Sequence, residues 1–279
     1  MTSPAPRTGT FARTSAWWRH DLAVAAAVLV WITSVLLLDR GAPLLRQELL
    51  GLGTCVLLLA LLRAETPLVR AQVAVVVAFA TLVEYTCSPL LHVYVYRLHN
   101  VPAFVPPGHG LVYLAAYSIG RSTLAQRYAR QAVTATVVLG GLYALRGLSP
   151  WAPRLDVLGA FWYLCLLGFL RWGRSRLLYV GAFLVVTYLE LMGTGLGTWT
   201  WQTHDPTGIV AMGNPPSGAA GGYGWFDLAA VAVAPWLLRR LPGRRGGAAS
   251  VAVATVAQPP EDLVVEAAVG GDGTTPVEH

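Results

Sequence analysis

Hydrophobic positions along this chain come in eight runs, separated by short stretches that carry arginine. The runs lie near residues 22–38, 48–62, 71–91, 108–120, 131–145, 156–170, 177–193 and 221–238. A helix needs about 20 mainly apolar residues to cross a bilayer, with a range of about 17–25. Several runs are shorter, but each can be extended into its flanks. The pattern therefore predicts an all-α, polytopic membrane protein with about eight transmembrane helices.

The arginines give an independent test of this alternation. The chain has 20 basic residues, and all of them are arginine. The N-terminal segment and the stretches that follow even-numbered runs hold 15 of the 20, and the opposite stretches hold Arg40, Arg46, Arg97, Arg146 and Arg154. Positive charge is retained on the cytoplasmic side of a membrane. We therefore expect both termini to be cytoplasmic, and we call this side the arginine-rich side.

Composition excludes an ordinary soluble domain. Hydrophobic residues make up 55% of the chain and charged residues only 12%, against about 25% charged residues in soluble proteins. The formal net charge of +6 is compatible with nucleic-acid binding, but such a surface gathers its arginines on one face with stacking aromatics. Here the arginines punctuate apolar runs instead. We expect a multi-pass protein of the cell membrane, with the lipid bilayer as a partner and no nucleic acid.

The two halves of the chain share a pattern. Glu84 and Glu190 are 106 positions apart, and a shift of 106 places the first three runs close to the fifth, sixth and seventh. Alternating aromatics follow each Glu, as Tyr94-Val-Tyr96 and as Trp199-Thr-Trp201, and a Pro-Pro pair comes after each. Four helices per copy is an even number, so the copies run parallel, as in some transporters. The predicted organisation is a cytoplasmic N-terminal segment, two membrane repeats and a disordered cytoplasmic tail, at residues 1–21, 22–127, 128–240 and 241–279.

Three carboxylates lie inside apolar runs, away from the ends of those runs, namely Glu84, Glu190 and Asp227. An ionisable group in the membrane costs a few kcal/mol on insertion scales and usually faces a cavity or a partner. One interpretation is a facing pair of glutamates, of which one keeps a proton to donate, with Asp227 supporting them. The other is structural, with each carboxyl bonded to a nearby Tyr or Trp. Asp227 is also predicted close to a helix start, where it would complement the helix dipole.

Aromatic and polar residues gather on the outer side, beside these carboxylates. They either form the interfacial belt that Trp and Tyr favour or line a site for an apolar or cationic intermediate, because aromatic faces stabilise positive charge. The histidines lack the spacing of metal ligands, so we expect no metal and no other cofactor. The candidate binding residues are Tyr94, Tyr96, His109, Trp199, Trp201, Asn214, Tyr223 and Trp225.

The segments that follow the two glutamates resemble the membrane-embedded carotenoid-biosynthesis hydratases of the bisanhydrobacterioruberin hydratase type. In that family a Glu late in a helix precedes a glycine-containing stretch, alternating aromatics and a Val-Pro segment. The matching residues are Glu84, Tyr94, Tyr96 and Val101-Pro102 in the first half, and Glu190, Gly193, Gly195, Gly197, Trp199 and Trp201 in the second. The resemblance implies acid chemistry on an isoprenoid: protonation of a terminal C=C bond, then water capture or ring closure.

Three functions remain open at this point. The first is an intramembrane enzyme of the lyase or isomerase type that acts on an isoprenoid or other apolar lipid, with Glu84 and Glu190 as acid and base. The second is a lipid or small-molecule transporter or flippase with the paired glutamates between the repeats. The third is a non-catalytic membrane subunit whose carboxyls bond to a partner helix. The sequence does not indicate the oligomeric state.

Overall fold

The computed structural model describes residues 9–240, with side chains from His20 onward, and this part of the chain is mostly helical. The tail expected at 241–279 and residues 1–8 lie outside it. Each of the eight apolar runs coincides with a helix. The helices are α1 (Gly9–Asp39), α2 (Leu44–Leu62), α3 (Pro67–Tyr85), α4 (Val105–Arg121), α5 (Thr123–Arg127), α6 (Ala129–Gly147), α7 (Val157–Trp172), α8 (Arg176–Gly195) and α9 (Ala219–Arg240).

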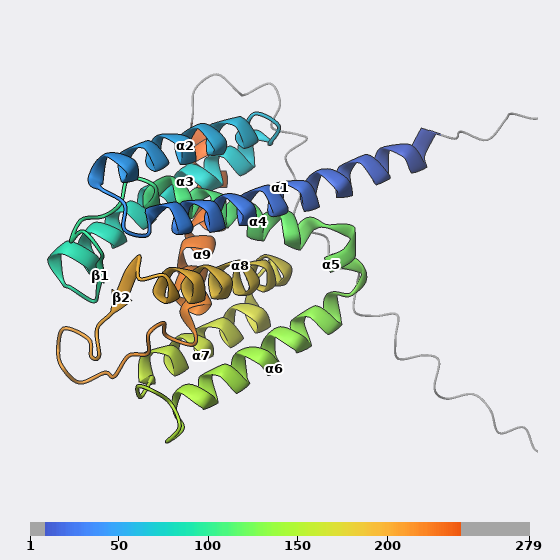
Figure 1. Ribbon diagram of the computed structural model, residues 1–279. Coiled ribbons are helices and arrows are strands. Elements are labelled where there is room, and N and C mark those ends of the chain that lie inside the picture. The colour runs from blue at the N-terminus through green and yellow to red at the C-terminus, as the bar shows by residue number, and fades with distance from the viewer. Residues whose placement is uncertain (1–8, 241–279) are drawn as a thin grey trace, which may run out of the picture. The chain divides into compact units, whose positions relative to one another are not determined.

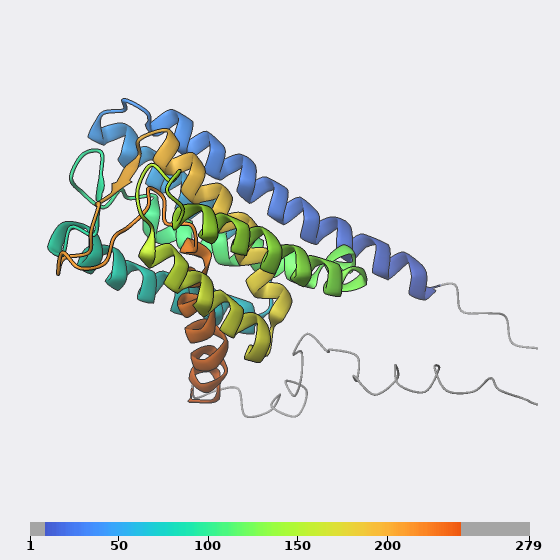
Figure 2. The same cartoon turned by 90° about the horizontal axis from the view of Figure 1, so that it is seen from below.

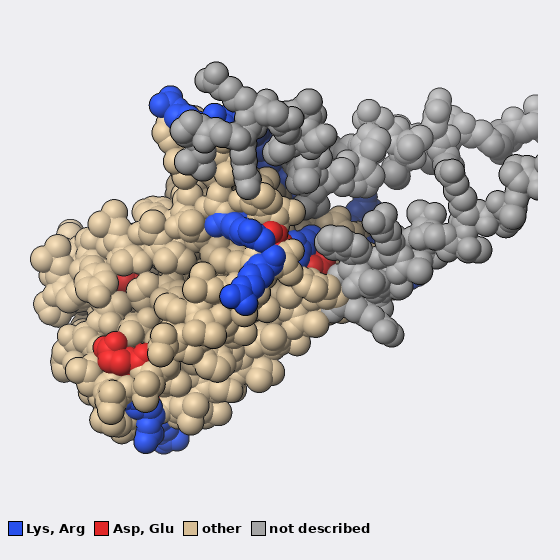
Figure 3. Space-filling view, turned by 90° about the horizontal axis from the view of Figure 1, so that it is seen from above, with Lys and Arg blue, Asp and Glu red and all other residues tan. Residues whose placement is uncertain are grey.

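Within residues 9–240, four helical segments are long and apolar enough to cross a membrane: His20–Asp39, Leu44–Leu62, Pro67–Leu90 and Arg176–Gly195. The third combines α3 with a π-helical turn, η1 (Thr86–Leu90). These four segments support the expected membrane location. Figure 3 agrees with it, because arginine (blue) and acidic side chains (red) occupy few places on the face shown, and uncharged residues cover most of the surface between them.

Two helix starts change where a predicted site residue lies. Helix α4 begins at Val105 and not near residue 108, because Pro106 and Pro107 occupy its first turn, where proline is well tolerated. His109 therefore lies inside the helix. Helix α9 begins at Ala219, so Asp227 lies in its third turn, beyond the reach of the dipole at the helix start. The dipole interpretation of Asp227 was wrong.

Helices α4 and α8 pack against each other between two outer pairs (Figure 1), with α2 and α3 on one side and α6 and α7 on the other. Helix α1 runs along α4, and α9 packs against α3, α7 and α8. Figures 1 and 2 show that α9 crosses the other long helices at a steep angle and that its last turns project beyond them. The middle of the bundle is thus built by α4 and α8, and most residues of both are buried.

A short antiparallel ribbon joins the two halves at one end of the bundle. Strand β1 (Tyr94–Tyr96) pairs with β2 (Trp199–Trp201), with Tyr94 opposite Trp201 and Tyr96 opposite Trp199. The all-α prediction missed these strands, although alternating aromatics have the period of a strand. Each segment has only three residues, and it is stabilised by a partner more than 100 positions away in the sequence. Neither segment predicts the pairing by itself.

Arg121, at the end of α4, ties three parts of the bundle together at the opposite end. Its Nε donates to Asp21 Oδ1 of α1 at 2.7 Å. Its Nη1 and Nη2 donate to the two carboxylate oxygens of Glu65 at 2.8 and 2.6 Å. Glu65 follows α2 and precedes α3, and both acids are buried. We call Arg121, Asp21 and Glu65 the ionic cluster.

Asp156 holds the long segment between β2 and α9 against the start of α7. Its buried carboxylate accepts hydrogen bonds from the backbone N–H groups of Gly159 and Gly213 at 2.9 Å and of Ser217 at 2.6 Å. We expect Asp156→Ala to lower the free energy of unfolding by about 3 kcal/mol, because it leaves buried N–H groups without acceptors. Unfolding in detergent micelles measures this loss. Asp205→Ala is the matched control, since Asp205 also accepts backbone bonds but is only partly buried, and an equal loss in both variants would contradict the prediction.

Candidate functional site

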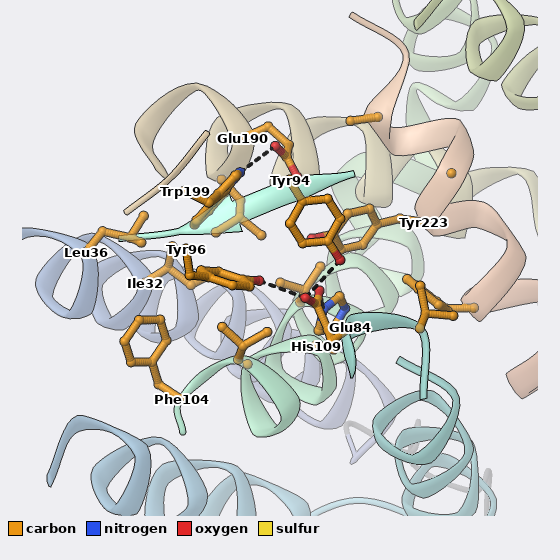
Figure 4. A pocket seen from close by; sticks show the side chains of 18 of the residues that line it. Ile32, Leu36, Glu84, Tyr94, Tyr96, Phe104, His109, Glu190, Trp199 and Tyr223 are labelled. Atoms are coloured by element: carbon orange, nitrogen blue, oxygen red, sulfur yellow. Dashed lines mark hydrogen bonds and ion pairs between the residues drawn. The ribbon is translucent and has the colours of Figure 1, made fainter. Parts of the chain in front are cut away.

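A cavity of about 190 Å³ lies where the ribbon covers the ends of α3 and α8. Both glutamates line it, so the structure brings together the two carboxylates that the sequence singles out. In Figure 4 one end of the cavity holds Glu84, His109 and Tyr223, and Ile32, Leu36 and Phe104 lie at the other. The site is therefore an apolar pocket with a small number of polar atoms at one end.

Glu84 accepts hydrogen bonds from both tyrosines of β1. Tyr94 Oη and Tyr96 Oη donate to Glu84 Oε2 at 2.9 and 2.8 Å. Burial, and then the nearby Glu84 charge, raise the pKa of both phenols, so they remain neutral donors. Glu84 Oε1 lies 2.9 Å from His109 Nε2. Both oxygens of Glu84 therefore have partners within the protein, with two phenol hydroxyls at Oε2 and the His109 imidazole at Oε1.

Glu190 has a different set of partners, although it occupies the corresponding position on α8. The indole N–H groups of Trp199 and Trp201 both donate to Glu190 Oε2 at 3.0 Å. Among the described residues, none makes a hydrogen bond to Glu190 Oε1. An indole N–H can only donate, so a proton on this carboxyl group has to sit on Oε1. The two glutamates thus differ in their surroundings, which acid and base roles require.

His109 and Tyr223 close the polar end of the cavity from α4 and α9. Their rings stack with centroids 5.1 Å apart, and the edge of Phe226 packs on His109 at 5.3 Å. His109 is fixed by these rings on its faces and by Glu84 at Nε2. The imidazole is therefore held as a partner of Glu84, and the π faces of Tyr223 and of the ribbon aromatics surround the space beside it.

Three predicted site residues do not line the cavity. Trp225 packs against the Phe169 ring of α7 and is about half exposed. It lies two positions after Tyr223, so the helix turns its side chain to nearly the opposite face. Asn214 Oδ1 accepts the backbone N–H of Trp201 at 2.9 Å and so supports β2 from outside. Asp227 is buried one turn beyond Tyr223. The other eight predicted residues line the cavity: Glu84, Glu190, Tyr94, Tyr96, His109, Trp199, Trp201 and Tyr223.

The sequence reasoning missed the apolar wall that α1 and α2 contribute. Trp31, Ile32, Val35 and Leu36 line the cavity from α1, and Trp31 Nε1 donates to Thr54 Oγ1 of α2 at 3.0 Å. The i, i+3 and i+4 spacing of these α1 residues marks one helix face. In an apolar run that spacing does not distinguish a cavity wall from ordinary packing. Thr54, a polar residue within a leucine-rich run, is the one visible signal.

Gly193 gives the indole of Trp199 the room it needs beside Glu190. A Cβ at this position would overlap the Trp199 ring, whereas a Cβ at Gly195 meets nothing within 4 Å. We expect Gly193→Ala to displace Trp199 and to lower the free energy of unfolding by about 1–3 kcal/mol, the usual cost of overpacking. Thermal unfolding in detergent checks this. Gly195→Ala is the matched control, and equal effects of the two variants would argue against the close fit at Gly193.

Among the described residues, no three His, Cys, Asp or Glu side chains converge as metal ligands do. Comparisons with known proteins do not extend the resemblance to the hydratases, which stays a prediction. No family model matches the chain, and no curated protein and no solved structure matches it either.

Proposed function

We propose that this protein is an intramembrane enzyme that protonates an isoprenoid or another apolar lipid. The observation that carries the proposal is the pair of buried carboxylates with unlike partners in one apolar cavity. A cavity of about 190 Å³ is smaller than sites that enclose whole drug-sized ligands, which take about 300–1,000 Å³. It therefore suits the end of a lipid chain, with the remainder of the chain in the bilayer.

In this proposal Glu190 is the acid. Its proton on Oε1 passes to one carbon of a C=C bond, the π pair forms the new C–H bond, and the other carbon becomes cationic. The faces of Tyr94, Trp199 and Tyr223 stabilise that charge. Glu84 is the base, with His109 bonded to its Oε1. It takes a proton either from an attacking water, which gives an alcohol, or from a carbon next to the cation, which gives an isomer or a ring.

We also propose eight crossings in two parallel copies, with both termini on the arginine-rich side. Two features support the duplication. Tyr94 pairs with Trp201 and Tyr96 with Trp199, which is the exchange that a twofold axis between the strands produces. Helix packing shows the same exchange between the two copies. Helix α4 packs on α8, and in the same way its counterpart α9 packs on α3. Within each copy, α3 packs on α4 and α8 packs on α9. Under the shift of 106, α3 corresponds to α8, and a longer loop before α9 makes α9 the counterpart of α4.

Transport is the competing function, because this twofold arrangement also occurs in transporters. Cys87 lines the cavity and can report its access in a variant that lacks Cys55 and Cys165. A transporter exposes Cys87 to a membrane-impermeant thiol reagent from both sides in turn, as the inward and outward states exchange. We expect no labelling from the arginine-rich side under any condition. Labelling from both sides would favour transport.

The reaction itself is tested by the lipids of cells that express the protein. We expect one isoprenoid or apolar lipid to be converted into a product that carries one more water or has the same mass with rearranged double bonds. Mass spectrometry of lipid extracts distinguishes these outcomes, and cells that express Glu190→Gln provide the control. Identical lipid profiles in the two cell lines would contradict the proposal.

A further inference from the structure

Helix α4 carries a titratable or charged side chain on each of four successive turns: His109, Tyr113, Tyr117 and Arg121. Residues four apart lie on the same side of a helix, so these side chains form a row. The row starts at Glu84 in the cavity, which His109 contacts, and ends at the ionic cluster. The rings of Tyr113 and Tyr117 stack at 6.2 Å, and the Arg121 guanidinium lies over Tyr117 at 5.1 Å.

Asp227 of α9 is a second buried titratable residue near this row. His109 stacks on Tyr223, and Tyr113 and Asp227 each lie one turn further along their own helices. The Asp227 carboxyl is within electrostatic reach of the hydroxyls of Tyr113 and of Tyr179 on α8. The proposed reaction in the cavity does not use Asp227, so the burial of this acid needs its own explanation.

Three buried polar atoms of this group have no hydrogen-bond partner among the described residues: His109 Nδ1, Tyr113 Oη and Asp227 Oδ2. The three residues are 6%, 1% and 4% exposed. Buried polar atoms are nearly always bonded, either to protein or to ordered water, and a buried water typically bonds to about three of them. His109 and Tyr113 lie on adjacent turns of α4, and Asp227 lies one turn beyond Tyr223, the residue of α9 that stacks on His109.

We propose that His109, Tyr113 and Asp227 bind internal water and carry protons between the ionic cluster and Glu84. Asp227 takes a proton from water that enters beside Tyr117 and passes it through the Tyr113 hydroxyl to His109 Nδ1. As the Nδ1–H bond forms, the Nε2–H bond breaks and Glu84 Oε1 receives that proton. A tautomer shift of the imidazole then restores its first protonation state, and the same steps in reverse order remove the proton from Glu84. Chains of Asp, His and Tyr with water are how membrane proteins move protons through apolar surroundings.

This route is independent of the reaction in the cavity. It resets Glu84 after each turnover if the proposed function holds, and it supplies protons equally well to a transport cycle. Asp227 and Tyr113 act on the site through His109, so they are positioning and relay residues and not catalytic ones.

Water contact at Asp227 tests the proposal directly. Solid-state NMR of the protein in liposomes measures how fast magnetisation passes from water to a chosen carbon. We expect transfer to the Asp227 carboxyl carbon to be as fast as to the exposed carboxyl of Glu48, and Tyr113→Phe to abolish it. Ser118→Ala is the matched control, because the Ser118 hydroxyl is also buried and unpartnered among the described residues but lies on another face of α4.

Two results would overturn the route. One is transfer to Asp227 as slow as to the methyl group of Ala230, which is fully buried in the same helix. The other is fast transfer that Tyr113→Phe leaves unchanged. Neither depends on turnover, whereas full activity of Glu190→Gln would contradict the proposed function and leave this NMR result intact.

Discussion

Glu190→Gln should reduce product formation by about 100- to 10,000-fold, the usual contribution of a general acid, while the folded yield stays the same. The amide oxygen of Gln accepts the indole N–H groups of Trp199 and Trp201 as Glu190 Oε2 does. The amide nitrogen then occupies the position of Oε1. The cavity keeps its shape, but the group there no longer carries an acidic proton.

Glu84→Gln should give a comparable loss for a different reason. The tyrosine hydroxyls can still bond to the amide oxygen, and His109 can accept from the amide nitrogen in its other tautomer, so the fold again survives. What is lost is the acceptor for the second proton. Any residual product should therefore consist of different species, formed when the cation loses its charge without proton transfer to residue 84. Lipid mass spectrometry measures both the amount and the pattern of product.

Glu48→Gln is the control for both variants. Glu48 is an exposed acid on α2, and its replacement should leave product formation unchanged. Activity at the level of the unmodified protein in either cavity variant would contradict the acid and base roles. A loss of folded yield in both would instead favour the structural interpretation, in which the carboxyls tie the helices together.

The carboxylate pair could be predicted because charge is rare in this chain. With few acids inside apolar runs, the recurrence of Glu84 at Glu190 stands out, and the alternating aromatics after each glutamate indicate their neighbours. Two aspects of the site were not predictable. The pairing of β1 with β2 decides which donors meet which carboxylate, and it joins segments more than 100 residues apart. The α1 wall is formed by Trp31 and Ile32, which look like lipid-facing residues in the sequence.

Errors in the predicted site have a common geometric cause. Tyr223 and Trp225 were treated together because they are close in sequence, but a helix turns them to different sides, and only Tyr223 reaches the cavity. The predicted run that became α4 starts near residue 108, after Pro106 and Pro107, although these prolines lie in the first turn of the helix. Membrane character followed from composition and from the arginines between apolar runs, whereas these details depend on where each helix starts and how it is rotated.

The ionic cluster carries the second large expected effect. Arg121→Met should lower the free energy of unfolding by about 3–5 kcal/mol, the cost of breaking a buried ion pair from one side. Methionine retains much of the apolar stem of arginine, so the loss comes from Asp21 and Glu65, which are each only 5% exposed. The stability of Arg121→Lys should lie between that of the unmodified protein and that of Arg121→Met. Lysine keeps the positive charge, but an ammonium cannot match the paired bonds that the guanidinium makes to Glu65.

The decisive variant combines Arg121→Met with Asp21→Asn and Glu65→Gln. If the loss comes from uncompensated buried charge, removing that charge should recover a large part of it, even though the combined variant has three altered side chains. Unfolding in mixed micelles, followed by circular dichroism, measures all four proteins. If Arg121→Met lowered the free energy of unfolding by less than about 1 kcal/mol, the cluster would contribute no more than ion pairs exposed to solvent do. That outcome would also weaken the case for the ionic cluster as the point where α1, the segment before α3 and the end of α4 are held together.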